Sequence, residues 1–211
     1  KLPASVVALL EEGIGRKVPD TLKPGDPVFE RVSNFIIGSN RLAVEAAIAE
    51  ARVRGYATIN SGSSFTGEAR ELAESQLEQA VGIARGSRAH RLPLCIVGGG
   101  ESTVKISGNG KGGRNQEQAL AFAIGLSRLE GSLRQRICYL SAGTDGNDGP
   151  TDAAGGFADA LLLQEAEKNR LDAVSFLSNN DSYNFLAAAG GHLLTGATGT
   201  NVCDIYITII T

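Results

Sequence analysis

The chain has 211 residues, of which 42% are hydrophobic and 20% are charged, and its formal net charge is −3. No apolar run approaches the roughly 18 residues that a membrane span needs, which excludes an integral membrane role. The slightly acidic balance argues against non-specific binding of nucleic acid, which requires clustered lysine and arginine side chains.

Secondary structure is predicted from hydrophobic periodicity, taken in chain order. Residues 1–12 resemble the end of a helix, and a proline-rich connector follows at 17–27. Short β-branched runs predict strands over 35–37, 56–59, 94–97, 103–107, 137–141 and 205–210. Helical spacing predicts helices over 39–54, 66–84, 116–126, 152–169 and 180–188. Strands and helices alternate over much of the chain, which indicates an α/β fold.

A polar, basic stretch at 84–91 interrupts this alternation and is predicted to be a linker. We therefore place a domain boundary after residue 88. Only about two strand–helix units precede the boundary, too few for a parallel layer that is stable alone. Residues 1–88 are predicted to be the tail of a larger α/β domain, and residues 89–211 a complete α/β domain.

The first motif that could take part in binding or catalysis is a glycine-rich loop at 108–113, which runs into a helix beginning near Arg114. Loop amides and a helix N-terminus together favour an anion, and a guanidinium at the junction can bind a phosphate or carboxylate with two hydrogen bonds. A hairpin turn with a basic tip is an equal alternative. The loop lacks the Gly-Lys-Ser/Thr ending of a Walker motif.

A second motif, at 142–152, follows a buried strand, where α/β proteins place ligands. Its Asp145 and Asp148 are oxygen donors that could hold Mg²⁺, or one of them could accept a hydroxyl proton. Ordinary Asp-Gly turn chemistry is the structural alternative.

A third motif, at 195–204, offers small hydroxyls and backbone amides before the last strand. An anion-binding nest and a simple turn are both consistent with it. The motif ends beside Cys203. With Cys95 and Cys138, this residue makes an odd and widely spaced set, which disfavours disulfides and zinc and favours a reducing, cytoplasmic compartment.

Together these motifs resemble the class II glycerate kinases. The runs that carry the resemblance are GGGESTV from residue 98, GKGGRNQE from 110, GTDGNDGPTDAAG from 143, NDSY from 180 and TGTNVCD from 198. They span the family's carboxyl-terminal MOFRL domain. Gly38-Ser-Asn and Thr66-Gly-Glu-Ala-Arg-Glu extend the likeness upstream, to about the carboxyl-terminal half of a family member.

The resemblance implies a kinase that phosphorylates D-glycerate with ATP and Mg²⁺, usually giving 2-phosphoglycerate, in a cleft between a Rossmann-like domain and the MOFRL domain. Arg114 matches the family's functional arginine, whereas the catalytic lysine belongs to the half not seen here. The expected partners are glycerate and a nucleotide, with neither nucleic acid nor membrane, and a homodimer is left open. A hydroxypyruvate reductase and a non-catalytic anion-binding module are the alternatives.

The candidate site follows from the motifs and the resemblance together. We predict that Arg114, Asp145 and Asp148 act in catalysis, and that the two aspartates also bind metal. An Arg114→Ala change is expected to abolish most turnover and leave the fold intact. The predicted substrate- and phosphate-binding residues are Gly99, Gly100, Glu101, Gly112, Gly113, Asn115, Thr144, Thr198, Gly199, Thr200 and Asn201.

Overall fold

The structure is a computed structural model that describes residues 2–86 and 91–211. It divides into two compact units, Lys1–Ile37 and Gly38–Thr211. Among the described residues, none of the helices is both long and apolar enough to pass through a bilayer.

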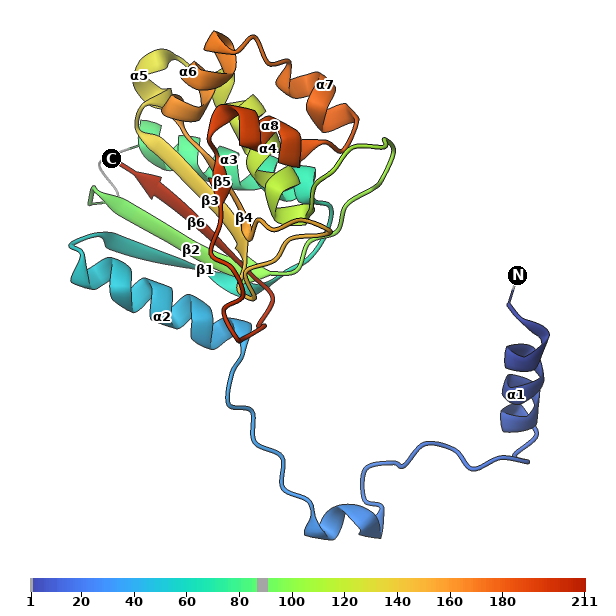
Figure 1. Cartoon of the computed structure of the whole chain (residues 1–211). Coiled ribbons are helices and arrows are strands. Elements are labelled where there is room, and N and C mark those ends of the chain that lie inside the picture. The colour runs from blue at the N-terminus through green and yellow to red at the C-terminus, as the bar shows by residue number, and fades with distance from the viewer. Residues whose placement is uncertain (1, 87–90) are drawn as a thin grey trace. The chain divides into compact units, whose positions relative to one another are not determined.

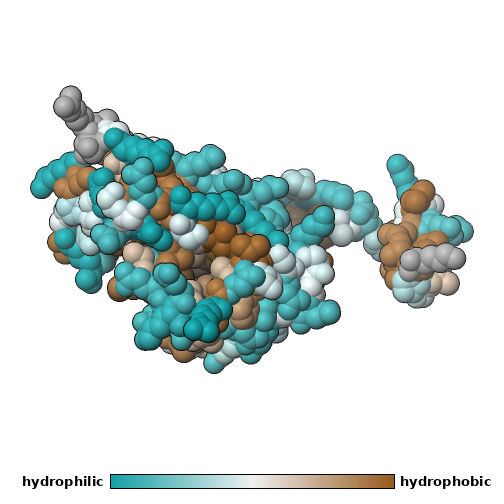
Figure 2. All heavy atoms as spheres, turned by 90° about the horizontal axis from the view of Figure 1, so that it is seen from above, coloured by the Kyte–Doolittle hydropathy of each residue, from teal (hydrophilic) through white to brown (hydrophobic). Residues whose placement is uncertain are grey.

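The first unit consists of two short helices with apolar residues on their surface. The helix α1 spans Ala4–Ile14 and buries none of its residues, and the 3₁₀-helix η1 spans Pro27–Arg31. In Figure 2 the hydrophobic residues of α1 stand on the surface at the right of the view. The strand predicted over 35–37 is wrong: Phe35, Ile36 and Ile37 are 84%, 85% and 95% exposed and belong to no strand. A β-branched run needs a neighbouring strand to pair its amides, and the described residues provide none.

The second unit is built on a six-stranded sheet with the strand order β1-β2-β6-β3-β4-β5 (Figure 1). Its strands are β1 (Ala57–Phe65), β2 (Leu94–Gly100), β3 (Ile137–Gly143), β4 (Gly155–Ala158), β5 (His192–Leu193) and β6 (Asp204–Ile210). The strands β1 and β2 pair in parallel, and the other neighbouring strands of this sheet pair antiparallel. The strand β6 lies between β2 and β3 and is antiparallel to both. The α/β class is confirmed, with a mixed sheet.

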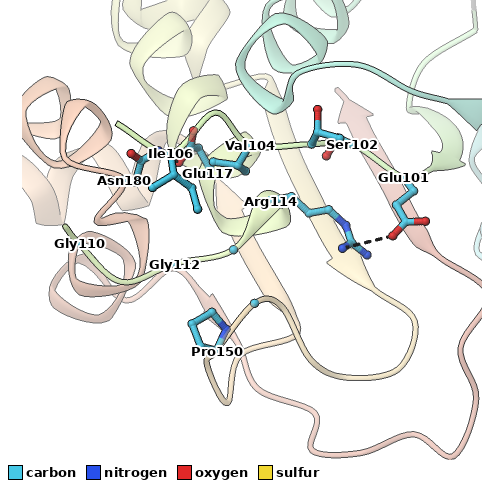
Figure 3. Close-up of a pocket in the computed structure, with 13 residues that line it drawn as sticks. Glu101, Ser102, Val104, Ile106, Gly110, Gly112, Arg114, Glu117, Pro150 and Asn180 are labelled. Atoms are coloured by element: carbon cyan, nitrogen blue, oxygen red, sulfur yellow. Dashed lines mark hydrogen bonds and ion pairs between the residues drawn. The ribbon is translucent and has the colours of Figure 1, made fainter. Parts of the chain in front are cut away.

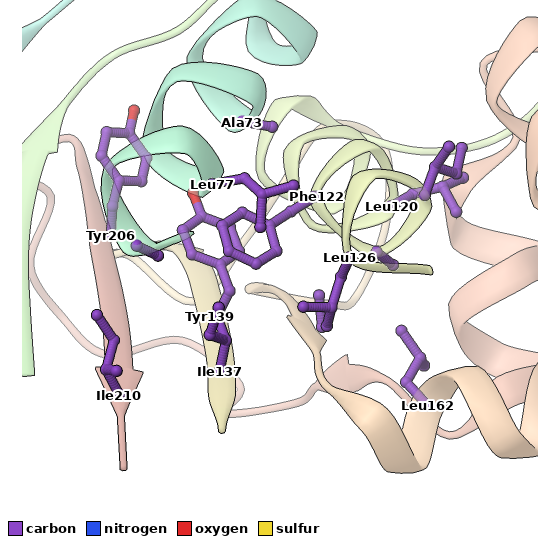
Figure 4. Packing of buried hydrophobic residues seen from close by; sticks show 14 of the residues in the cluster. Ala73, Leu77, Leu120, Phe122, Leu126, Ile137, Tyr139, Leu162, Tyr206 and Ile210 are labelled. Carbon is purple, nitrogen blue, oxygen red and sulfur yellow. The ribbon is translucent and has the colours of Figure 1, made fainter. Parts of the chain in front are cut away.

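Helices cover the two faces of this sheet unequally. The helix α2 (Asn40–Val53) packs on β1 and β2, while α3 (Ala69–Arg85) and α4 (Arg114–Ser127) pack together against the opposite face. The main core lies under α3 and α4, where Phe122 stacks on Tyr139 at a centroid distance of 4.1 Å (Figure 4). The remaining helices are α5 (Gly131–Arg134), α6 (Ala160–Lys168), α7 (Ala173–Ser178) and α8 (Ser182–Ala189).

Two further predicted elements differ from the structure. The helix predicted from residue 152 begins only at Ala160, where the Asp159 carboxylate caps it by accepting the Leu162 amide at 2.8 Å. The preceding residues form β4, which pairs with β3. Gly155 allows this close approach, because a Cβ there would overlap the carbonyl of Ser141 on β3. The strand predicted over 103–107 is irregular, with a single bridge between Thr103 and Glu68.

The predicted domain boundary, between residues 88 and 89, lies outside the described residues and stays a prediction. On either side of it, β1 pairs with β2 from Ala57–Leu94 to Phe65–Gly100. The strand β1 therefore belongs to the same sheet as the carboxyl-terminal strands, and α2, β1 and α3 belong to the same compact unit as the carboxyl-terminal part of the chain.

Candidate functional site

The site lies at one end of three neighbouring strands, where β2 and β3 end and β6 begins. β2 ends at Gly100 and β3 at Gly143, and both glycines are in register with Asp204, the first residue of β6. Asn40, at the start of α2, donates its side-chain amide to the carbonyls of Val202 and Asp204 at 2.8 and 2.7 Å. A Cβ on Gly99 would overlap the Asn40 side chain, so this glycine allows close packing.

Arg114 lies above this end of the sheet as the first residue of α4. Its Nε and Nη2 atoms donate to the two carboxylate oxygens of Asp204 at 2.6 and 2.9 Å, and Asp204 is fully buried. Its Nη1 lies 3.5 Å from the Glu101 carboxylate (Figure 3). The hydrogen bond with Asp204 raises the pKa of Arg114, which therefore stays protonated.

Asp148 occupies the N-terminus of α4. Its carboxylate accepts the backbone amides of Asn115 and Gln116 at 3.1 and 2.9 Å, and their side-chain amides at 3.2 and 3.0 Å. Burial raises the pKa of Asp148 against the opposing effect of these hydrogen bonds. A carboxylate of the protein thus takes the place at the helix N-terminus where one of the two interpretations of the sequence placed a bound anion.

The glycine-rich loop is fastened to the segment before α8. The Asn180 Oδ1 accepts the amides of Ser107 and Gly108 at 2.8 and 2.9 Å, and the Asp181 carboxylate accepts that of Lys111 at 2.8 Å. A Cβ on Gly108 or on Gly110 would overlap this segment. The glycines therefore serve close contact between two loops, and these amides are not free for a phosphate.

A buried ion pair that the sequence did not indicate holds Asn180 in place. The Asn180 side-chain amide donates to Glu117 Oε2 at 2.9 Å, and Arg70 Nε donates to Glu117 Oε1 at 2.8 Å. Arg70 also donates to the carbonyl of Leu177 at 2.9 Å. The position of Glu117 on the buried side of α4 was the only signal that could have revealed it.

A pocket of about 560 Å³ opens between these loops. Of the predicted site residues, Glu101, Gly112, Gly113 and Arg114 line it, together with the apolar side chains of Val104, Ile106 and Pro150 (Figure 3). Asn115 lies beneath it, buried and bonded to Asp148 and Ser141. The first two motifs thus contribute to one pocket with a guanidinium at its wall.

A profile of the MOFRL family matches residues 94–204, which include every residue of this pocket. The chain belongs to the MOFRL family. The resemblance inferred from the motifs is thereby confirmed.

Curated relatives and solved structures agree with this placement. The chain is 38% identical to "Glycerate 2-kinase" of Pyrococcus horikoshii over 100% of its own length and 46% of the relative, and 34% identical to "Glycerate kinase" of Danio rerio over 99% and 49%. The crystal structure of a glycerate kinase from Thermotoga maritima superposes with a TM-score of 0.79 at 38% identity, covering 85% of this chain and 42% of that one. The chain spans about half the length of the curated relatives it matches.

The third motif of this MOFRL chain lies beside the pocket and binds the second. Thr144 Oγ1 accepts the amide of Val202 at 2.9 Å, and Asn201 donates its side-chain amide to Asp145 Oδ2 at 3.0 Å. Thr198 donates its amide to the Asp145 carbonyl at 3.2 Å. Thr144 and the exposed turn Thr198, Gly199, Thr200 and Asn201 are absent from the pocket lining, so their substrate-binding role stays a prediction.

The two aspartates predicted to bind Mg²⁺ are engaged in different structures. Asp148 caps α4, and Asp145 accepts the Asn147 amide at 3.0 Å in its own turn. Nowhere in residues 2–86 and 91–211 do three or more histidine, cysteine or acidic side chains gather as a metal site would require. Both carboxylates already accept hydrogen bonds within the fold, and the catalytic and metal roles of both aspartates stay predictions.

Proposed function

We propose that this chain supplies part of the active site of a kinase that phosphorylates D-glycerate with ATP and forms 2-phosphoglycerate. Two relatives that match at 34% and 38% identity carry the names glycerate kinase and glycerate 2-kinase. The observation that carries the proposal is the pocket at the strand ends, because it combines an arginine, a mostly exposed carboxylate and loop backbone at one place. Phosphoryl transfer depends mainly on such positioning and on charge stabilisation.

Arg114 is the residue proposed to contact the substrate. Asp204 fixes two of its nitrogens and leaves Nη1 facing the pocket, where it can bind the carboxylate of glycerate or the transferred phosphoryl group. Asp204, Glu101 and Asp148 already surround this single positive charge. Further positive charge for the nucleotide phosphates must therefore come from outside these residues, from Mg²⁺ carried by ATP and from the lysine that the family resemblance places in the other half.

The test is ADP release in a coupled assay with ATP, Mg²⁺ and D-glycerate, using the complete open reading frame that encodes this chain. We expect glycerate-dependent ADP release from the complete protein and none from the 211-residue chain alone. Product analysis identifies the phosphorylated hydroxyl. NADH oxidation with hydroxypyruvate in place of ADP release would overturn the proposal in favour of a reductase, and ligand binding without turnover would favour a binding module.

A further inference from the structure

The acidic residues near the pocket differ in what they already bind. Asp204 pairs with Arg114, Asp148 caps α4, and Glu117 accepts from both Arg70 and Asn180. These three are buried, with exposures of 0%, 2% and 2%. None of them can take up a proton from a substrate without breaking contacts that hold the loops in place.

Glu101 is different because its backbone is fixed while its carboxylate is mostly exposed, in a 3.5 Å ion pair with Arg114 and a 3.8 Å contact with Cys203 Sγ. Its amide donates to the carbonyl of Phe65 at 2.9 Å, directly after the end of β2. The preceding Gly100 approaches Phe65 so closely that a Cβ would overlap its backbone. The Glu101 side chain is 59% exposed, lines the pocket and faces Arg114 (Figure 3). A rigid strand end therefore presents a mostly exposed carboxylate to the pocket, paired with Arg114 at 3.5 Å.

Transfer of a phosphoryl group to an alcohol requires an acceptor for the hydroxyl proton, and a carboxylate within hydrogen-bond distance provides it. Resting on the function proposed above, we propose that Glu101 orients the hydroxyl of glycerate and accepts its proton. The O–H bond breaks and the proton passes to a Glu101 carboxylate oxygen. The hydroxyl oxygen bonds to the γ-phosphorus, and the bond from the γ-phosphorus to the β–γ bridging oxygen breaks and releases ADP.

The distance between Glu101 and Arg114 suits a hydroxy acid. Arg114 Nη1 and Glu101 Oε1 are 3.5 Å apart, so a carboxylate and a hydroxyl on neighbouring carbons of one molecule can contact both at once. The guanidinium would hold the carboxylate while Glu101 receives the hydroxyl. This arrangement assigns the pocket to the acceptor substrate and leaves the nucleotide to approach from outside it.

A thiol beside Glu101 reports on whether the substrate enters. The Cys203 Sγ lies 3.8 Å from Glu101 Oε2 and is partly accessible. D-glycerate bound against Glu101 would cover it. Protection of Cys203 from iodoacetamide, followed by peptide mass spectrometry, therefore measures occupancy without measuring turnover.

The experiment compares Glu101→Gln, Glu101→Asp and the control Glu78→Gln in the complete open reading frame. Glu78 is an exposed glutamate on α3, away from the pocket. We expect Glu101→Gln to lower kcat by about 10²–10⁴-fold with little change in the KM for ATP. Glu101→Asp should recover part of the rate, and Glu78→Gln should match the wild type.

The outcomes separate this proposal from the proposed function. An active wild type whose Glu101→Gln variant keeps kcat within threefold overturns the role of Glu101 and leaves the kinase proposal intact. An active wild type in which D-glycerate does not protect Cys203 also overturns it, because the substrate then lies elsewhere. A complete protein without glycerate-dependent ADP release overturns the proposed function and this inference together.

Discussion

Replacing Asp148 by alanine removes the acceptor of three donors at the start of α4. The backbone amides of Asn115 and Gln116 and the side-chain amide of Asn115 lose their partner. The side chain of Gln116 keeps an acceptor, since it also donates to Thr151 Oγ1 at 3.0 Å. At about 1 kcal/mol for each buried donor left unpaired, we expect the free energy of unfolding to fall by about 3 kcal/mol.

Urea denaturation followed by circular dichroism measures this loss. With an m value of about 2–3 kcal/mol/M, the midpoint should fall by about 1 M. The control is Asp152→Ala, which removes an exposed carboxylate that accepts from the Tyr183 hydroxyl at 2.8 Å and should shift the midpoint much less, because an exposed hydrogen bond contributes little. If Asp148→Ala shifts the midpoint no more than this control does, the capping role is refuted. Asp148 would then remain a candidate metal ligand, as predicted from the sequence.

Arg114→Ala leaves the buried Asp204 carboxylate without its partner, so we now expect a loss of about 3 kcal/mol in stability besides the loss of turnover. In the Arg114→Ala variant, the second substitution Asp204→Asn should restore much of the lost free energy of unfolding, measured by chemical denaturation. A double variant no more stable than Arg114→Ala alone would contradict the pairing of Arg114 with Asp204. Gly110→Ala should lower the melting temperature because the new Cβ would overlap the facing loop. Gly82→Ala lies inside α3 with nothing within 4 Å of the new Cβ, so it should stabilise the protein by about 0.5–1 kcal/mol. Equal melting temperatures for the two variants would contradict this contrast. Burial, aided by nearby carboxylates, raises the pKa of Cys203, so at pH 8 iodoacetamide should alkylate it more slowly than a free thiol, and faster reaction would be the contrary result.

The fold class and the meeting of the motifs were predictable from the sequence. Buried strands that end in glycine place the following residues at the same end of a sheet, so Glu101 after β2 and Thr144 after β3 could be expected near each other. The antiparallel insertion of β6 between β2 and β3 could not be predicted, because pairing order depends on contacts between distant segments.

The roles of individual residues were harder to predict than their location. A glycine-rich loop before a helix has the same composition whether its amides bind a phosphate or another loop, and here Asn180 and Asp181 take them. In the same way, Asp148 follows a strand as a metal ligand would, but its carboxylate reaches back to α4. Partners that lie about 30 and 70 residues away in sequence decide both cases.

We propose that the strand ends of this chain form the acceptor-substrate pocket of a glycerate kinase. A crystal structure of the complete protein with D-glycerate and a non-hydrolysable ATP analogue tests it most directly. We predict that the glycerate carboxylate contacts Arg114 Nη1 and that a hydroxyl lies within hydrogen-bond distance of Glu101. Glycerate bound away from both residues, with the pocket filled by solvent, would contradict the account.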